Sequence, residues 1–255
     1  AALIRFFQNH GMMSVFGRGL WRTVEGGSRA YVQALKAAFH GEVRTGEAVA
    51  GIRRDAAGVT VQLACGRLER FDEVVIATHA DTALGLLEDP TAEEARWLSP
   101  FRYSKNRVAL HTDPALMPKR RRAWSSWNHI GRRSEPGEGC VTYWMNRLQG
   151  LKDAPDLFVT LNPTKPIAAG KTIRTEAYDH PLFDAAAIAA QDRLWDLQGV
   201  NRTWFCGSYF GHGFHEDGLQ AGLAVAEQLG GVRRPWRVAG ESGRIKVRGP
   251  AEPAA

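Results

Sequence analysis

Four glycines and two acidic residues lie close together between positions 207 and 218, and this spacing suits the binding of a ligand by the main chain. The glycines are Gly207, Gly211, Gly213 and Gly218. Because glycine has no side chain, such a segment lets backbone N–H groups approach a ligand closely. Glu216 and Asp217 add negative charge, so the segment would repel a phosphate group but not a neutral acceptor such as a ring carbonyl. The same spacing also fits an ordinary capped helix after a flexible loop.

The elements on either side of this segment must position it. Residues 204–206, WFC, form an apolar run that is too short for a helix and predicts a buried strand. From Leu219 onward, apolar and small residues recur with helical spacing until Gly230 and Gly231 end the pattern. A strand, a glycine-rich loop and a helix N-terminus in this order bring free N–H groups to one place.

The segment resembles the C-terminal flavin motif of the flavin-containing amine oxidase superfamily, and more closely that of bacterial FAD-dependent oxidoreductases known as predicted NAD/FAD-binding proteins. The resemblance implies FAD as cofactor, with Gly207 and Ser208 passing its ribityl chain and pyrophosphate. It also implies that the helix start points N–H groups at the pyrimidine end of the isoalloxazine. There they would stabilise the negative charge that develops at N1 and O2 when the flavin is reduced. That helix start consists of Glu216, Asp217, Gly218 and Leu219.

Two earlier segments carry weaker parts of the same resemblance. Gly26 and Gly27 match a glycine turn that lies near the flavin in the family and opens a helix. Val49 lies in a region of strand-like alternation and matches a valine whose backbone N–H and C=O pair with the adenine. Since only the backbone of Val49 would contact the base, its side chain can equally belong to the core.

Residues 74–77, VVIA, are a third matching segment. They form a continuous apolar run, as expected of a strand that is covered on both faces in a parallel sheet. The resemblance implies that this strand ends at the cofactor, with Ala77 and Thr78 beside it. His79 follows, where the family often has proline or glycine, and is expected to cap a helix or make a polar contact.

The fold class that the resemblance implies is α/β: an incomplete FAD-binding domain, Rossmann-like and of the glutathione-reductase type, with an inserted α+β substrate domain. The aromatic residues between positions 100 and 181 could line an apolar pocket or simply form a core. The predicted parts are residues 1–97, which form part of the FAD-binding domain; 98–198, the substrate domain; 199–231, the C-terminal strand and helix of the FAD-binding domain; and 232–255, a disordered basic tail.

The sequence departs from the family pattern in two places. It has no strand followed by G-x-G-x-x-G, the turn that receives the FAD pyrophosphate, so we expect an N-terminally truncated chain that lacks the first βαβ unit. Whether such a chain binds FAD or is active is left open. Many family members have a catalytic lysine on the first substrate-domain strand. Here Asn106 stands nearest that place, and Lys105 is expected on the opposite face.

The predicted function is that of an FAD-dependent oxidoreductase, in which a substrate hydride passes to flavin N5. The substrate would be an amine or a lipid-like alkyl chain that is dehydrogenated or desaturated, and no catalytic residue is assigned. The alternative is a non-catalytic interaction protein on a flavoprotein scaffold. A metal hydrolase is disfavoured, because His212, His215 and Glu216 lack the helical i, i+4 histidine pair, and no metal ligand is predicted.

Composition and charge indicate where the protein is located and what it can bind. The chain of 255 residues has a net charge of +6 and no apolar run near the ~18 residues of a membrane span. Cys65, Cys140 and Cys206 read as free thiols, which favours a reducing, cytoplasmic location. Two basic segments, 119–122 and the tail, leave peripheral contact with a membrane open, but no nucleic-acid-binding motif accompanies them. The expected partner is a small-molecule substrate, and the oligomeric state is open.

Overall fold

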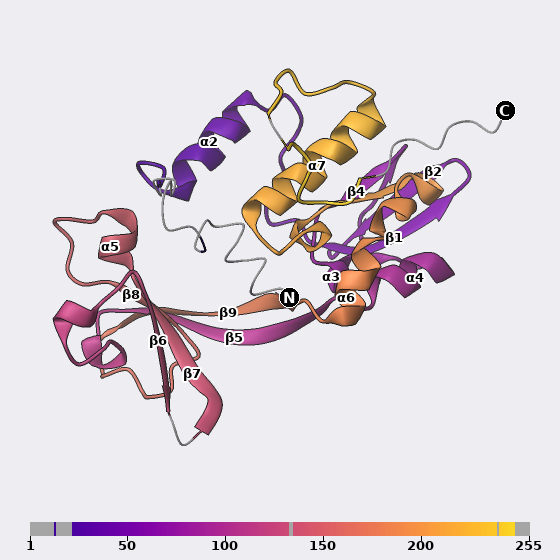
Figure 1. The fold of residues 1–255 in the computed structure, drawn as a ribbon. Helices are drawn as coiled ribbons and strands as arrows, with labels where there is room; N and C mark the ends of the chain where they lie inside the picture. The colour runs from indigo at the N-terminus through magenta and orange to yellow at the C-terminus, as the bar shows by residue number, and fades with distance from the viewer. Residues whose placement is uncertain (1–12, 14–21, 133–134, 239, 248–255) are drawn as a thin grey trace. The chain divides into compact units, whose positions relative to one another are not determined.

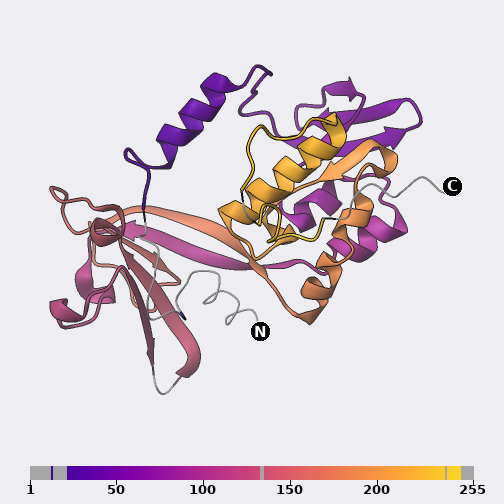
Figure 2. The same cartoon turned by 45° about the horizontal axis from the view of Figure 1, so that its top comes forward.

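The computed structural model describes residues 13, 22–132, 135–238 and 240–247, and the chain divides into two compact units (Figures 1 and 2). Unit 1 comprises Ala1–Arg102 and Pro181–Ala255, and unit 2 comprises Tyr103–His180. The second unit is narrower than the substrate domain of 98–198 expected from the sequence. The reason is that α6 (Ala185–Gln191) and η3 (Leu194–Leu197) pack against α4 (Ala92–Leu98) within unit 1.

Unit 1 contains two sheets. The first is an antiparallel meander of β1 (Val49–Asp55), β2 (Gly58–Leu63) and β3 (Leu68–Phe71). Its first hairpin is closed by Asp55, whose carboxylate accepts hydrogen bonds from the N–H groups of Ala57 at 2.8 Å and Gly58 at 3.1 Å. This is the usual way in which aspartate stabilises a turn.

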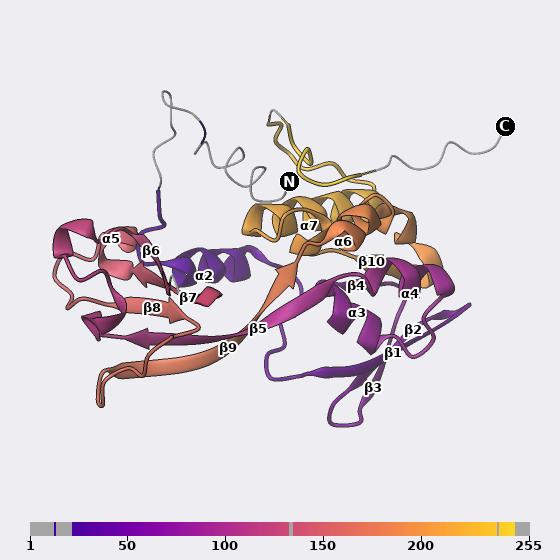
Figure 3. The same cartoon turned by 60° about the horizontal axis from the view of Figure 1, so that its bottom comes forward.

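The second sheet of unit 1 pairs β4 (Val74–Ile76) with β10 (Thr203–Phe205) in parallel, as the two apolar runs predicted. Figure 3 shows α6 and α7 (His215–Gly230) on one side of this pair and the meander on the other. Ile76 and Phe205 are buried, but Val75 is 42% exposed, so β4 is not covered on both faces as its apolar run predicted. The α/β class predicted from the sequence is nonetheless confirmed.

The other helical segments described in unit 1 lie before β1, after β4 and on either side of β10. The glycine turn opens α2 (Ser28–Ala38), which has no buried residue. A helix α3 (Ala80–Leu86) follows β4, and the 3-10 turns η4 (Val200–Arg202) and η5 (Ser208–Phe210) flank β10. The chain after α7 was predicted to be disordered. In the structure its residue Ile245 is buried, and Arg234 forms an ion pair with Glu227 of α7 at 2.6 Å.

Unit 2 is built on a five-stranded sheet in the order β6-β7-β8-β5-β9. The strands are β5 (Arg102–His111), β6 (Trp127–Arg132), β7 (Glu135–Trp144), β8 (Phe158–Leu161) and β9 (Thr172–Leu182), joined by η1 (Pro114–Leu116), η2 (Arg121–Ala123) and α5 (Met145–Gln149). One face of the sheet is buried, and its core includes Phe158 packed with Met117 and Trp124. The opposite face is half-buried, with Leu110, Tyr143 and Val159 in register across β5, β8 and β7.

A buried polar chain crosses the covered face of this sheet. The His111 Nε2 and Thr160 Oγ1 atoms lie 2.7 Å apart, and Thr160 Oγ1 lies 2.8 Å from Thr142 Oγ1. The backbone N–H of Asp113 donates to His111 Nδ1 at 3.1 Å, so the imidazole carries its proton on Nε2. Burial lowers the pKa of His111, although the nearby Asp113 carboxylate acts in the opposite direction.

Among the described residues, no helix combines the length and apolar character that crossing a bilayer requires.

Candidate functional site

Gly207 stands where the carboxyl ends of the two parallel strands of unit 1 meet. Its ideal Cβ would lie 2.7 Å from a ring carbon of the buried Tyr209 and 3.2 Å from the carbonyl oxygen of Thr78. Any side chain at this position would therefore displace its neighbours. The site needs glycine because the main chain passes directly between the end of β4 and the ring of Tyr209. Crevices at the carboxyl ends of parallel strands are the usual ligand sites of open α/β sheets.

The loop that follows Gly207 folds back over the start of α7. Gly211 and Gly213 each donate a backbone hydrogen bond of 3.1 Å to the carbonyl oxygen of Ser208. An ideal Cβ on Gly211 would meet the Asp217 carboxylate at 2.5 Å, so glycine is required here also. The loop predicted from glycine spacing is thus a compact turn against the helix.

Asp217 is buried beneath this turn and neutralised by the C-terminal segment. Its carboxylate accepts hydrogen bonds from the N–H groups of His212 at 3.0 Å and Phe214 at 2.8 Å. Arg244 Nε donates to the same carboxylate at 2.6 Å. That hydrogen bond raises the pKa of Arg244, although burial acts the other way, so the guanidinium keeps its charge beside the carboxylate. The sequence suggested two bare acidic charges at the helix start, but only the exposed Glu216 remains as one.

The first turn of α7 is open to an outside acceptor. Its N-cap residue is Phe214, which has no side-chain acceptor for the N–H groups of the turn. Gly218 is half-buried, and its ideal Cβ would lie 3.7 Å from the Ser208 nitrogen, an ordinary contact distance. Leu219 is 55% exposed. The N–H groups of Asp217 and Gly218 donate to the Phe214 carbonyl at 3.1 and 3.2 Å, which leaves those of His215 and Glu216 for an outside acceptor.

The structure brings some of the expected cofactor residues together and leaves others apart. Thr78, Gly207, Ser208, Asp217 and Gly218 are linked by the contacts above, and Ala77 is exposed just before Thr78. The role of these residues in binding FAD stays a prediction.

For Gly26, Gly27 and Val49, the structure shows contacts only within their own turn or sheet among the described residues. The two glycines form a left-handed turn, with φ angles of 80° and 77°, that leads into α2. Val49 begins β1, pairs with Leu63 and is 38% exposed. Their contact with a cofactor also stays a prediction.

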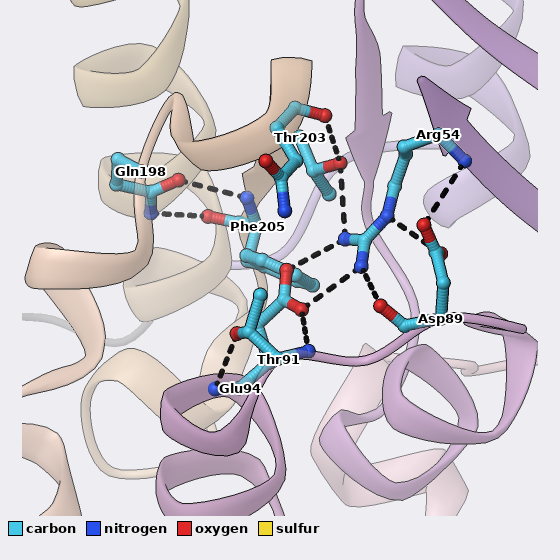
Figure 4. A network of polar contacts seen from close by, with 8 residues as sticks. Arg54, Asp89, Thr91, Glu94, Gln198, Thr203 and Phe205 are labelled. Carbon is cyan, nitrogen blue, oxygen red and sulfur yellow. Dashed lines mark hydrogen bonds and ion pairs between the residues drawn. The ribbon is translucent and has the colours of Figure 1, made fainter. Parts of the chain in front are cut away.

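A buried ion-pair network anchors the strand that leads to Gly207 (Figure 4). Arg54 of β1 is 1% exposed in its side chain and Glu94 of α4 is 0% exposed. Two guanidinium nitrogens of Arg54 donate to the Glu94 carboxylate at 2.6 and 3.0 Å. The other donors reach Asp89 Oδ1 at 2.9 Å, the Asp89 carbonyl at 2.7 Å and Thr203 Oγ1 at 3.3 Å. All five N–H donors are used, so Arg54 holds structure and has none left for a ligand.

Glu94 is held from a second side. Its carboxylate accepts from the Thr91 N–H at 2.7 Å, and Thr91 Oγ1 accepts from the Glu94 N–H at 3.1 Å, which makes a capping box. Burial alone would raise the pKa of Glu94, but the hydrogen bonds from Arg54 and Thr91 outweigh it and lower the pKa below its ordinary value. The carboxylate is therefore ionised at neutral pH.

The network matters for the candidate site because it ends on β10. Thr203, the first residue of β10, contacts Arg54, and Gln198 holds Phe205 at both its N–H and its C=O, at 2.8 and 2.7 Å. The strand that delivers Gly207 is thereby fixed by side chains as well as by β4. The sequence analysis missed this network. A signal was present, since Arg54 shares the buried face of β1 with Ile52.

A polar cluster lies on the half-buried face of unit 2. It consists of Ser104, Asn106, Asn162 and His180, and we call it the amide cluster. Asn106, which the sequence analysis placed nearest the position of the family's catalytic lysine, lies in this cluster. Lys105 is 87% exposed on the other side of β5, where it pairs with Asp179 at 3.4 Å, as the strand alternation predicted.

No group of three or more His, Cys, Asp or Glu side chains is arranged to hold a metal ion within the described part of the chain.

Comparisons with known proteins agree with this geometry. The model of the flavin-containing amine oxidoreductase family matches residues 2–145. Among solved structures, a protein assigned as a protoporphyrinogen oxidase from Exiguobacterium sp. 255-15 is 13% identical, with a TM-score of 0.60 over 89% of this chain and 57% of its own. A putrescine oxidase variant is 12% identical, with a TM-score of 0.54 over 81% of this chain and 53% of its own.

A fatty acid isomerase from P. acnes that produces CLA is 14% identical, with a TM-score of 0.51 over 71% of this chain and 47% of its own. The chain thus spans about half the length of these structures, and the likeness concerns the fold. No curated protein matches the sequence.

Proposed function

The chain belongs to the flavin-containing amine oxidoreductase family, and from this we propose that it supplies the isoalloxazine side of the cofactor site in an FAD-dependent oxidoreductase. FAD is the cofactor of this family. When bound, it accepts a hydride from the substrate at N5, while the protein contributes position and electrostatics.

The observation that carries the proposal is the position of Gly207 between the ends of β4 and β10 and the start of α7. A side chain there would meet the buried Tyr209 at 2.7 Å, so packing of the loop requires glycine, and the main chain at the strand ends carries no side chain. We assign the backbone of Gly207 and Ser208 to the ribityl and pyrophosphate region, beside Ala77 and Thr78.

The start of α7, from Glu216 to Leu219, would face the pyrimidine end of the ring. The N–H groups of Asp217 and Gly218 already donate to the Phe214 carbonyl at 3.1 and 3.2 Å, so the donors to the ring would be those of His215 and Glu216. The Arg244 side chain neutralises Asp217, so the positive end of the helix dipole is not cancelled by a buried charge. Such a site would stabilise negative charge that develops at N1 and O2. Glu216 sits in the same turn but is exposed, where solvent screens it.

Three further residues complete the assignment by resemblance. The backbone of Val49 would pair with the adenine, and the turn at Gly26 and Gly27 would lie near the flavin. The exposure of Val49 and the left-handed glycine turn are compatible with both roles.

The substrate we propose is an amine or a lipid-like alkyl compound that is dehydrogenated or desaturated. The presence of Asn106 near the family's lysine place favours C–H dehydrogenation over amine oxidation. The structurally similar proteins include a putrescine oxidase and a fatty acid isomerase, so the fold serves both substrate types.

The second candidate is a non-catalytic interaction protein on the same scaffold. It is favoured by the parallel sheet, which has two strands in the described residues, and by the lack of a G-x-G-x-x-G turn in the sequence. Such a protein would keep the glycine loop without binding flavin.

A fluorescence titration of flavins with the chain separates the two candidates. Riboflavin, FMN and FAD would each be quenched if the isoalloxazine side is present. Gly218→Ala should weaken binding, because its Cβ fits the protein at 3.7 Å from Ser208 but takes space beside the exposed N–H groups. Gly222→Ala is the matched control in the same helix, since nothing lies within 4 Å of its ideal Cβ. The absence of quenching by all three flavins would favour the interaction protein.

A further inference from the structure

In the amide cluster of unit 2, a backbone N–H group at one end determines which atom donates and which accepts in each hydrogen bond. The N–H of Arg107 donates to Asn162 Oδ1 at 3.0 Å, and a backbone N–H can only donate. The oxygen of the Asn162 amide is thereby identified, so its Nδ2 is the donor to Asn106 Oδ1 at 2.8 Å. The Asn106 amide is oriented in turn, and its Nδ2 points to His180 Nδ1 at 2.9 Å.

This series of hydrogen bonds selects one tautomer of His180. Because Nδ1 accepts a hydrogen bond from Asn106, the proton of the neutral imidazole sits on Nε2. The second proton of the Asn106 amide goes to the carbonyl of Ser104 at 2.8 Å, so the amide has no freedom to rotate. His180 therefore presents a fixed Nε2–H donor and has no free lone pair with which to act as a base.

Asn162 is held in an unusual backbone conformation for this purpose. Its φ of 50° lies in the left-handed region, which asparagine tolerates better than most residues. The residue follows β8 directly. Its side-chain oxygen accepts a hydrogen bond from the Arg107 N–H, and its side-chain nitrogen donates one to Asn106.

The donor stands at the end of an apolar row on the same face of the sheet. Asn106 and Leu110 share a face of β5, with the buried Val108 between them, and the register continues from Leu110 to Val159 and Tyr143. Tyr143 pairs with Trp127, whose ring stacks on it with centroids 6.4 Å apart and planes 6° from parallel. Trp127 is 47% exposed, so this row offers surface to an apolar molecule.

Four of the charges near the donor form two ion pairs. On the same face of β9, Arg174 pairs with Glu176. On the opposite face Lys105 pairs with Asp179. Recognition at His180 therefore depends on the N–H donor rather than on a net charge.

We propose that His180 is a substrate-binding residue that donates its Nε2–H to the terminal oxygen acceptor, carboxylate or carbonyl, of an elongated apolar molecule lying along this row. An ammonium group has no lone pair to accept that hydrogen bond, so a protonated amine is rejected. The inference rests on the proposed function and narrows its substrate class to the lipid-like one. Asn106 and Asn162 act through His180 as positioning residues.

The test uses the full chain without flavin, labelled with ¹⁵N in histidine, and dodecanoate, 2-dodecanone and dodecylammonium as probes. The ¹⁵N shifts of His180 should report the Nε2–H tautomer before any probe is added. Dodecanoate and 2-dodecanone should shift the Nε2–H signal on binding, and dodecylammonium should not. His180→Phe should weaken dodecanoate binding at least tenfold in calorimetry, since a hydrogen bond to a charged group is lost.

Two variants separate this role from a structural one. Asn162→Ala should bring the Nδ1–H tautomer of His180 into the spectrum and weaken dodecanoate binding. Lys105→Gln, on the opposite face of β5, should change neither. An Nδ1–H tautomer in the unaltered chain, or dodecanoate binding that is unaffected by His180→Phe, would overturn the inference. Because no flavin is present, this outcome is independent of whether the chain binds FAD.

Discussion

Replacing Arg54 by methionine tests whether the buried network fixes the strand that leads to the flavin loop. The change removes five hydrogen bonds and leaves the carboxylate of Glu94, which is 0% exposed, with no cation beside it. Removing one partner of a buried ion pair typically costs about 3–5 kcal/mol of unfolding free energy. We expect a loss in this range for Arg54→Met, because the Thr91 N–H is the only donor that Glu94 retains within the network.

A second substitution identifies the origin of the loss. In Arg54→Met/Glu94→Gln no charge remains buried, while the amide oxygen can still accept from Thr91. This variant should regain roughly half of the lost stability, because the cost of an uncompensated buried charge is removed. Arg70→Met is the matched control on β3 of the same sheet, where the partner Asp55 is exposed and the change should be small.

The assay is urea unfolding followed by far-UV circular dichroism at several pH values. The pKa of Glu94 is lowered in the folded state, so its contribution is present above the ordinary value of 4.5 and is lost as the pH falls below it. The gap between the original chain and Arg54→Met should therefore narrow in acid. A gap below about 1 kcal/mol at neutral pH would refute the reasoning, because it would mean that the Arg54–Glu94 pair is not desolvated.

Three further predictions concern the loop, the C-terminal segment and unit 2. Gly207→Ala should lower the urea midpoint and abolish flavin binding because of the contact with Tyr209, whereas Gly222→Ala should leave both unchanged; equal effects would contradict the assignment. Asp217→Asn should release the segment around Arg244, and trypsin should then cleave there faster, with unchanged cleavage as the contrary result. Burial lowers the pKa of His111, so stability should fall as the pH drops below about 6.5, and His111→Gln should lose this dependence between pH 6.5 and 5; an unchanged slope would contradict it.

Much of the scaffold could be predicted from the sequence, because it depends on local patterns. The apolar runs at 74–77 and 204–206 predicted two strands, and both occur as a parallel pair, although Val75 is 42% exposed and not covered as expected. The glycine spacing predicted a loop between β10 and a helix, and the structure has that order. In each case neighbouring residues carry enough information, since period and turn chemistry are short-range properties.

The interactions that fix the site could not be predicted in the same way. Arg54 and Glu94 are 40 positions apart, and Asp217 and Arg244 are 27 apart, so their pairing depends on how distant elements pack. Composition suggested that the segment containing Arg244 is disordered, because charges were counted without their partners. The hydrogen-bond direction in the amide cluster likewise depends on a backbone N–H of another strand.

The most direct test of the proposed function is the absorbance spectrum of the purified chain after incubation with FAD and removal of the unbound cofactor by gel filtration. We predict that flavin absorbance co-elutes with the chain, and that Gly218→Ala reduces it while Gly222→Ala does not. Elution of the chain without flavin, at FAD concentrations that saturate a binding site of ordinary affinity, would contradict the assignment of Gly207 and the α7 start to the cofactor. That result would favour the second candidate function, a non-catalytic interaction protein on the flavoprotein scaffold.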